Sequence, residues 1–265
     1  MNFIDEIQVV EINPTELCNL ACSFCPRSTF YPNQNLHMSL ETADEISRQL
    51  QAVGYSNEVS ITGRGEPTLH PEFDKLCNTF FDRDWTTKTN TNGKRYDKWS
   101  ETVNRFDKVI WNCYEHTEDQ YRDEIERFKD KKNFVVNYKP IDMAWQTRAS
   151  FTNRAGSFPI NHQPDLGYCD TPFVKIFIDY EGTYRLCCED WKDKIVMGSI
   201  WNEPITDYIE NNAKLKEYRK RLAEGDRSLT PCASCSYNIT SNKNGCSENK
   251  WKSLQLMTRM ENLGV

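Results

Sequence analysis

The sequence has no long apolar segment. Its longest apolar runs have the length of a single strand, and the run at residues 173–178 is interrupted by Lys175. A membrane-spanning helix needs about 20 consecutive, predominantly apolar residues, so the sequence excludes one. The first six residues include acidic side chains and no long apolar stretch, which is not typical of a secretory signal peptide. We therefore expect a cytoplasmic protein with no membrane partner.

A dense block of basic residues is also missing. The chain has 33 Lys and Arg against 39 Asp and Glu, which gives a formal net charge of −6. Binding to a nucleic-acid backbone depends on clustered Lys and Arg, so a nucleic acid is not expected as a partner. Low-complexity tracts are absent as well, and a chain of 265 residues buries enough surface for an ordinary core without disulfides.

Cysteine, in contrast, is abundant. The chain has 11 cysteines, a high and odd number. In a chain of this length with no export signal, cysteines are expected to be metal ligands rather than members of a disulfide framework. Their spacing therefore carries the functional information.

Strand and helix patterns alternate through the first half of the chain. Strands are predicted over residues 6–13, 59–62, 86–91, 108–113 and 134–138, and helices over residues 39–51, 72–81 and 118–129. This alternation predicts an α/β fold of parallel strands joined by right-handed helical crossovers. Residues 150–170 are rich in Asn, Gly, Pro and Ser and indicate a domain boundary or a lid. Further on, we expect a hairpin over residues 173–187 and helices over residues 204–222 and 250–263.

The first chemical motif is C-x3-C-x2-C, formed by Cys18, Cys22 and Cys25 directly after the first predicted strand. Three thiolates within eight residues can bind one iron–sulfur cube and leave its fourth iron without a protein ligand. A zinc knuckle is the alternative. It needs a fourth Cys or His, for which His37 is the nearest candidate.

The second motif, T-G-R-G-E-P at residues 62–67, ends the second predicted strand. Gly63 and Gly65 let the backbone approach a ligand closely, and the Glu66 carboxylate can bind an ammonium group. Both motifs follow neighbouring strands, at the edge where α/β barrels place their chemistry.

The two motifs together resemble those of the radical S-adenosylmethionine (SAM) enzymes. The segment C-N-L-A-C-S-F-C-P at residues 18–26 is similar to the family's cluster loop, in which the residue at Phe24 lies by the adenine of SAM. The segment G-R-G-E-P at residues 63–67 resembles the element that binds the methionine amino group, although Arg64 stands where the family usually has Gly. The resemblance covers residues 6–156 and implies an incomplete (β/α)6 barrel similar to a TIM barrel.

The same resemblance implies a reaction and further ligands. A reduced [4Fe–4S] cluster on Cys18, Cys22 and Cys25 would cleave SAM to a 5′-deoxyadenosyl radical, which abstracts hydrogen from a substrate C–H bond, with an external electron donor such as flavodoxin or ferredoxin. Asn112 is a candidate for contact with the SAM ribose, the alternative being an ordinary strand-surface Asn. Arg154 is a candidate for binding the SAM carboxylate or an anionic substrate group, the alternative being a surface arginine.

The last third of the chain holds a second cysteine set. Cys169, Cys187, Cys232 and Cys235 resemble the auxiliary-cluster module called twitch, a shortened relative of SPASM. The resemblance implies a β-hairpin plus helix that binds a second [4Fe–4S] cluster, with residues 1–156 as the core and residues 157–265 as the auxiliary domain. Four cysteines also suit tetrahedral zinc. A cluster held by four protein thiolates has no open iron, so its expected task is electron transfer, which indicates an oxidation.

Four cysteines are left over. Cys77 is expected to be a small core residue, and Cys188, beside a ligand, is an alternative fourth ligand. Cys113 or Cys246 could donate a hydrogen atom to a substrate radical, which would make the net reaction a redox-neutral epimerisation.

Three functions compete on this evidence. The cysteine spacing and the V-M-G-S-I segment at residues 196–200 resemble those of twitch-bearing dehydrogenases that oxidise a secondary alcohol, so dehydrogenation of a small hydroxylated molecule is the first hypothesis. The second is a peptide or protein maturase, which commonly carries an N-terminal peptide-binding domain that we do not expect here. The third is a zinc-stabilised binding module without catalysis.

Overall fold

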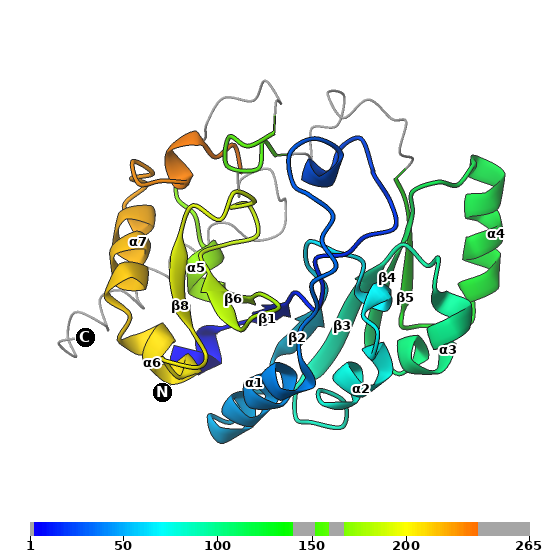
Figure 1. Ribbon diagram of the computed structural model, residues 1–265, viewed down its shortest axis with the longest axis horizontal. Coiled ribbons are helices and arrows are strands. Elements are labelled where there is room, and N and C mark those ends of the chain that lie inside the picture. The colour runs from blue at the N-terminus through cyan, green and yellow to red at the C-terminus, as the bar shows by residue number, and fades with distance from the viewer. Residues whose placement is uncertain (1–2, 140–151, 159–166, 238–265) are drawn as a thin grey trace. The chain divides into compact units, whose positions relative to one another are not determined.

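A computed structural model describes residues 3–139, 152–158 and 167–237 (Figure 1). The chain divides into two compact units. Residues 9–147 and 178–182 form the first, which we name the barrel unit, and residues 1–8, 148–177 and 183–265 form the second, the C-terminal unit. The expected domain boundary after residue 156 remains a prediction, because residues 140–151 and 159–166 on either side of it lie outside the described part.

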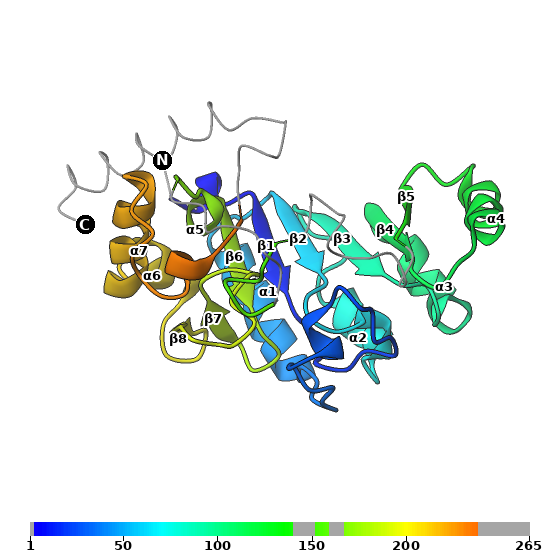
Figure 2. The ribbon, with the colours of Figure 1, turned by 90° about the horizontal axis from the view of Figure 1, so that it is seen from above.

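Parallel strands and helices alternate in the barrel unit, as the sequence pattern predicts. The described strands are β1 (Val9–Ile12), β2 (Glu58–Ile61), β3 (Thr86–Thr91), β4 (Lys108–Cys113) and β5 (Phe134–Tyr138), and they neighbour one another in sequence order. The helices between them are α1 (Leu40–Ala52), α2 (Phe73–Asn78), α3 (Tyr96–Asn104) and α4 (Glu118–Phe128), and α3 and α4 lie beside β4 and β5 (Figure 2). Helix α3 was not expected from the sequence, because it is short and polar and contains a non-helical residue, Trp99.

The two faces of this sheet differ in chemistry, because successive side chains of a strand point to opposite sides. The ring of Trp111 in β4 lies 4.6 Å, between centroids, from the ring of Phe128 in α4, so this is the face that the helices cover. The opposite face, which we name the polar face, carries the side chains of Glu11, Ser60, Lys88, Asn90, Asn112 and Asn137. Glu11, Ser60 and Lys88 are direct neighbours across three strands.

The C-terminal unit contains the strands β6 (Lys175–Ile178), β7 (Thr183–Arg185) and β8 (Val196–Ser199). The two strands of the hairpin expected over residues 173–187, β6 and β7, are neighbours in the sheet, and β7 pairs on its other side with β8 in antiparallel orientation. Its described helices are α5 (Thr171–Val174), α6 (Ile205–Glu210) and α7 (Ala213–Ala223). No helix among the described residues is long and apolar enough to cross a membrane.

Two local predictions in this unit are wrong. The single helix expected over residues 204–222 is two helices, because α6 ends at Glu210 and Asn212 caps α7 by accepting a hydrogen bond from Leu215 N at 2.9 Å. The strand expected from residue 173 begins at Lys175, because Pro172 favours a first helical turn over residues 171–174. The helix expected over residues 250–263 lies outside the described residues.

Candidate functional site

The loop after β1 holds three cysteines close together. Cys22 is buried, and Cys18 and Cys25 are half-buried. Asn33 holds both sides of the Cys18 residue, because its Oδ1 accepts from Cys18 N and its Nδ2 donates to Cys18 O, each at 2.8 Å. The Cys25 N–H donates to Cys22 O at 2.9 Å. These bonds fix the loop that presents the thiols.

The three thiols affect one another electrostatically. Burial raises the pKa of Cys22 to about 12, and the nearby Cys25 and Cys18 add to the rise because adjacent thiolates repel one another. Bound cations reverse this penalty, since a metal ligand must be a thiolate. The donor set therefore fits a metal cluster, with three thiolates for one cube.

The zinc alternative does not fit this loop. Among the described residues, no three His, Cys, Asp or Glu side chains are arranged to hold a single metal ion. His37, the expected fourth ligand, has both ring nitrogens in hydrogen bonds, Nδ1 with Thr15 Oγ1 and Nε2 with Asn35 Oδ1, each at 2.9 Å. Its ring is therefore a structural element of the loop.

The G-R-G-E-P loop packs directly against the segment after β1. Gly63 has a φ of +124°, and a Cβ there would lie 2.5 Å from Asn13 Oδ1. A Cβ on Gly65 would overlap the carbonyl oxygen of Thr15. Both positions thus require glycine because the chain packs against itself there, and Glu66 N donates to Leu17 O at 2.9 Å to close the contact. The close approach of a ligand to this backbone remains a prediction.

Glu66 has a role that the sequence did not predict. Its buried carboxylate accepts hydrogen bonds at Oε1 from Thr68 N, Thr68 Oγ1 and Thr91 Oγ1, at 3.2, 2.6 and 2.7 Å, and at Oε2 from Asn92 N at 2.8 Å. Burial raises the pKa of Glu66 by more than these hydrogen bonds lower it, so the pKa lies above its usual value. The carboxylate thus joins the loop after β2 to the end of β3, and binding of an ammonium group remains a prediction.

Arg64 belongs to a cationic stack in the same loop. The buried Arg27 pairs with Glu16 at 2.9 Å, and its Nε donates to Arg64 O at 2.7 Å. The Arg64 guanidinium donates to Tyr31 Oη at 2.8 Å, and both guanidinium carbons lie about 5 Å from the Tyr31 ring centre. An arginine at the position usually taken by Gly is therefore accommodated by stacking on Tyr31.

Three buried polar atoms on the polar face have no hydrogen-bond partner among the described residues: Ser60 Oγ, Asn90 Oδ1 and Asn112 Oδ1. A buried polar atom without a partner costs about 1–3 kcal/mol. They come from the neighbouring strands β2, β3 and β4, so they point to a polar ligand on this face. Asn112 Oδ1 could accept a hydrogen bond from a ribose hydroxyl, and its contact with the SAM ribose remains a prediction.

Phe24, within the cluster loop, packs against Tyr114. Their ring centroids are 5.6 Å apart, and burial together with Cys22 raises the pKa of Tyr114. Phe24 as an adenine neighbour remains a prediction. Cys113 points elsewhere: burial and Glu124 of α4 raise its pKa to about 11, which places it on the helix-covered face. That position does not suit a hydrogen-atom donor to a ligand on the polar face.

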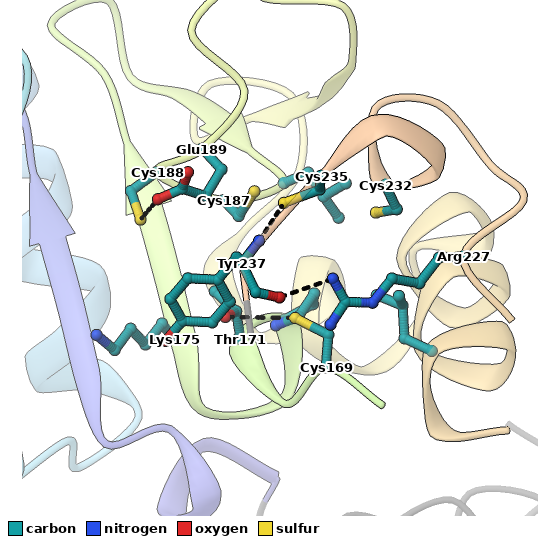
Figure 3. A pocket seen from close by; sticks show the side chains of 13 residues that line it. Cys169, Thr171, Lys175, Cys187, Cys188, Glu189, Arg227, Cys232, Cys235 and Tyr237 are labelled. Atoms are coloured by element: carbon teal, nitrogen blue, oxygen red, sulfur yellow. Dashed lines mark hydrogen bonds between the residues drawn. The ribbon is translucent and has the colours of Figure 1, made fainter. Parts of the chain in front are cut away.

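The second cysteine set surrounds one pocket of the C-terminal unit (Figure 3). Cys169 precedes α5, and Cys187 follows β7. Cys232 begins the 3-10 turn Cys232–Ser234, and Cys235 follows it. All four cysteines line the pocket. Burial raises the pKa of Cys232 to about 12, and repulsion from Cys169 and Cys235 contributes. The structure thus brings the four residues together, and their role as ligands of one cluster remains a prediction.

Cys188 also lines this pocket. Its Sγ lies 3.9 Å from Glu189 Oε1. Cys77 is fully buried in α2, as expected of a core residue, and Cys246 lies outside the described residues.

Residues 153–156, with the sequence N-R-A-G, support the same pocket. Arg154, with a φ of +48°, forms an ion pair with Glu189 at 2.9 Å. Asn153 accepts from Ser236 N and donates to Ser234 O, at 2.9 and 2.7 Å, and so fixes the chain on both sides of Cys235. Sequence reasoning missed Asn153, and the SAM-carboxylate role of Arg154 remains a prediction.

Comparisons with known proteins agree with this picture. The family model of the radical SAM superfamily matches residues 12–135, and that of the SPASM iron–sulfur cluster-binding domain matches residues 169–236. The chain is 23% identical to the S-adenosyl-L-methionine-dependent 2-deoxy-scyllo-inosamine dehydrogenase of Niallia circulans over 236 residues, 86% of this chain and 92% of that protein. It is 31% identical to a GTP 3′,8-cyclase of Vibrio cholerae over 93 residues, 34% of this chain and 28% of that protein.

Solved structures share the fold. The crystal structure of BtrN in complex with AdoMet and 2-DOIA superposes with a TM-score of 0.72 at 23% identity, over 88% of this chain and 94% of that one. Streptococcus suis SuiB bound to its precursor peptide SuiA gives 0.55 at 14% identity, over 87% and 70%. The predicted fold class is therefore confirmed, and the second family model favours iron–sulfur over zinc in the C-terminal unit.

Proposed function

Because this chain is a radical SAM enzyme with an iron–sulfur cluster-binding SPASM domain, we propose that it dehydrogenates a secondary alcohol of a small hydroxylated molecule. The observation that carries the proposal is the pocket lined by Cys169, Cys187, Cys232 and Cys235. Four protein thiolates leave no iron open to a substrate. Such a site is suited to accepting an electron.

The atoms and electrons of this oxidation balance. Conversion of a secondary alcohol to a ketone removes a hydrogen atom, a proton and an electron. When bound, SAM and the two clusters supply the radical that takes the hydrogen atom and an acceptor for the electron. The initial electron comes from an external donor such as flavodoxin or ferredoxin, and the proton leaves from the hydroxyl group to a base or to water.

The residues of the barrel unit have defined tasks in this proposal. Cys18, Cys22 and Cys25 hold the first cluster and leave one iron to SAM. Gly63 and Gly65 let the loop that binds the methionine end of SAM pack directly against the segment after β1, since neither position has space for a Cβ. Phe24 covers the adenine, and Asn112 meets the ribose.

The polar face supports the proposed substrate class. Ser60 Oγ and Asn90 Oδ1 are buried without partners among the described residues, so hydroxyl groups of a substrate would supply the missing hydrogen bonds. The match to 2-deoxy-scyllo-inosamine dehydrogenase extends over 92% of that protein. It favours a small molecule over a peptide.

The first test asks whether the loop cysteines cleave SAM. A variant with Cys18, Cys22 and Cys25 changed to Ala should form no 5′-deoxyadenosine from SAM and dithionite, and should keep about half of the iron if both clusters have four irons. Cys77→Ala is the matched control, because Cys77 is buried in α2 outside both sites, and it should retain cleavage. Continued cleavage in the triple variant would refute the assignment.

The second test identifies the reaction. Candidate polyols and amino polyols carry deuterium at a carbinol carbon, and 5′-deoxyadenosine is examined for the label while the product is examined for a ketone. Label together with a ketone supports dehydrogenation. Label with an inverted alcohol would instead establish an epimerase.

A further inference from the structure

Arg227 is a buried cation without an anionic partner among the described residues. Arg227 is 3% exposed. Within the described part of the chain, its guanidinium donates three hydrogen bonds, all to backbone carbonyls. Nε donates to Gly167 O at 2.6 Å, Nη1 to Tyr237 O at 2.9 Å and Nη2 to Tyr168 O at 3.0 Å. A buried charge is costly unless an opposite charge is nearby. The fold must therefore supply negative charge close to this guanidinium.

Thiolate ligands in the cysteine pocket would supply this negative charge. Arg227 lines this pocket, and Figure 3 shows its guanidinium directed toward Cys169. Cys187, Cys232 and Cys235 line the same pocket. The guanidinium therefore lies at the site of all four proposed thiolate ligands.

The other charged groups at the pocket do not replace it. Glu189 is bound by Arg154 at 2.9 Å and by the Thr152 hydroxyl, so its charge is already matched. Lys175 lines the pocket, but its ammonium group extends away from the sulfur atoms (Figure 3). The nearby carboxylates of Asp170 and Asp190 add negative charge beside Cys169 and Cys232.

We infer that Arg227 sets the reduction potential of the auxiliary cluster by holding one positive charge against its thiolate ligands, and that it is thereby a positioning residue for electron transfer out of the substrate. The inference rests on the proposed electron-accepting role of this cluster. Reduction adds one negative charge to the cluster, and net charge and hydrogen bonding are what set such potentials. The cation therefore makes the cluster easier to reduce.

The test measures the potential of this cluster alone. The host is the full chain with Cys18, Cys22 and Cys25 changed to Ala, so that the auxiliary cluster holds all of the iron. Its midpoint potential is determined by redox titration followed by electron paramagnetic resonance. Arg227→Gln should lower the equilibrium constant for reduction at least tenfold, which is about 59 mV for a one-electron couple.

Two further variants separate charge from structure. Arg227→Lys keeps the positive charge but loses the set of three hydrogen bonds to backbone carbonyls. Its midpoint potential should therefore stay close to that of the host. Arg219→Gln is the matched control: Arg219 is 1% exposed and donates to Pro172 O and Ile209 O at 2.9 and 2.7 Å, but it does not line the pocket. Its loss should shift the potential much less.

Each outcome decides the inference. Equal shifts for Arg227→Gln and Arg219→Gln, or no shift for either, would overturn it. If Arg227→Gln binds no iron, retention of iron at normal potential by Arg227→Lys supports the charge, whereas loss of iron from both shows that Arg227 acts only by bracing the backbone and overturns the inference. Absence of iron from the host itself would instead refute the auxiliary cluster and the proposed function.

Discussion

Replacing Glu66 by Gln separates two roles for its carboxylate. The motif predicts an ammonium-binding group, whereas the structure shows a carboxylate that joins the loop after β2 to the end of β3. Its Oε1 accepts from Thr68 and Thr91, and its Oε2 accepts from Asn92 N at 2.8 Å. When one carboxylate oxygen is replaced by an NH2 group, the hydrogen bonds accepted by that oxygen are lost and those accepted by the other oxygen can remain.

The expected cost follows from that geometry. A glutamine that keeps its oxygen at the Oε1 position turns its NH2 group toward the Asn92 N–H. The change removes a charge-assisted hydrogen bond worth about 1.5–3 kcal/mol and leaves a buried donor unsatisfied at about 1–3 kcal/mol. Burial raises the pKa of Glu66, so a neutral side chain recovers part of this loss. We expect the free energy of unfolding to fall by about 2–4 kcal/mol.

Urea-induced unfolding of the full chain, followed by far-ultraviolet circular dichroism, measures the change from the shift in midpoint. The matched control is Glu72→Gln, because exposed Glu72 forms a surface ion pair with Lys75 at 2.8 Å and such pairs contribute little. SAM affinity is measured in parallel. A Glu66→Gln variant as stable as the control but with weakened SAM binding would refute the structural role.

Three other predictions concern the barrel unit. Gly65→Ala should lose the iron of the first cluster and keep that of the second, because a Cβ would overlap the Thr15 carbonyl oxygen; full iron content would contradict this. Asn33→Ala removes both bonds to the Cys18 residue and should lower occupancy of the first cluster several-fold, as seen in its absorbance, since each bond is worth about 1 kcal/mol. Burial lowers the pKa of His70, so its contribution to stability is present above the unfolded pKa and is lost as pH falls through the lowered folded value. His70→Gln should therefore flatten the decline of the unfolding free energy between about pH 7 and pH 5, and an unchanged slope would argue against this role.

The sequence could predict features that depend on local spacing. Cys18, Cys22 and Cys25 are close in sequence, so their proximity in the structure follows from a single loop. The alternation of strands and helices is local in the same sense. These features suffice to predict parallel α/β strands and the first candidate site, whereas the barrel was predicted from the resemblance to radical SAM enzymes. The need for glycine at Gly63 and Gly65 is not local, because it comes from Asn13 and Thr15, 50 positions earlier.

Contacts between distant segments could not be predicted in this way. Arg227 binds the carbonyls of Gly167 and Tyr168, 60 and 59 positions earlier, and Asn153 binds Ser236 across 83 positions. A backbone carbonyl leaves no trace in the choice of side chain, so no motif or periodicity indicates these partners. The break before α7 depends likewise on Asn212, whose Nδ2 reaches Met197 O at 2.7 Å.

The start of the chain belongs to the C-terminal unit, and this affects the order in which the protein is completed. The turn Phe3–Glu6 packs against α6, and Gln8 N donates to Val174 O at 2.8 Å. On the ribosome, residues 3–8 must therefore wait until more than 160 further residues have been translated before these partners exist. The earliest described segment of the chain is thus among the last to reach its final contacts.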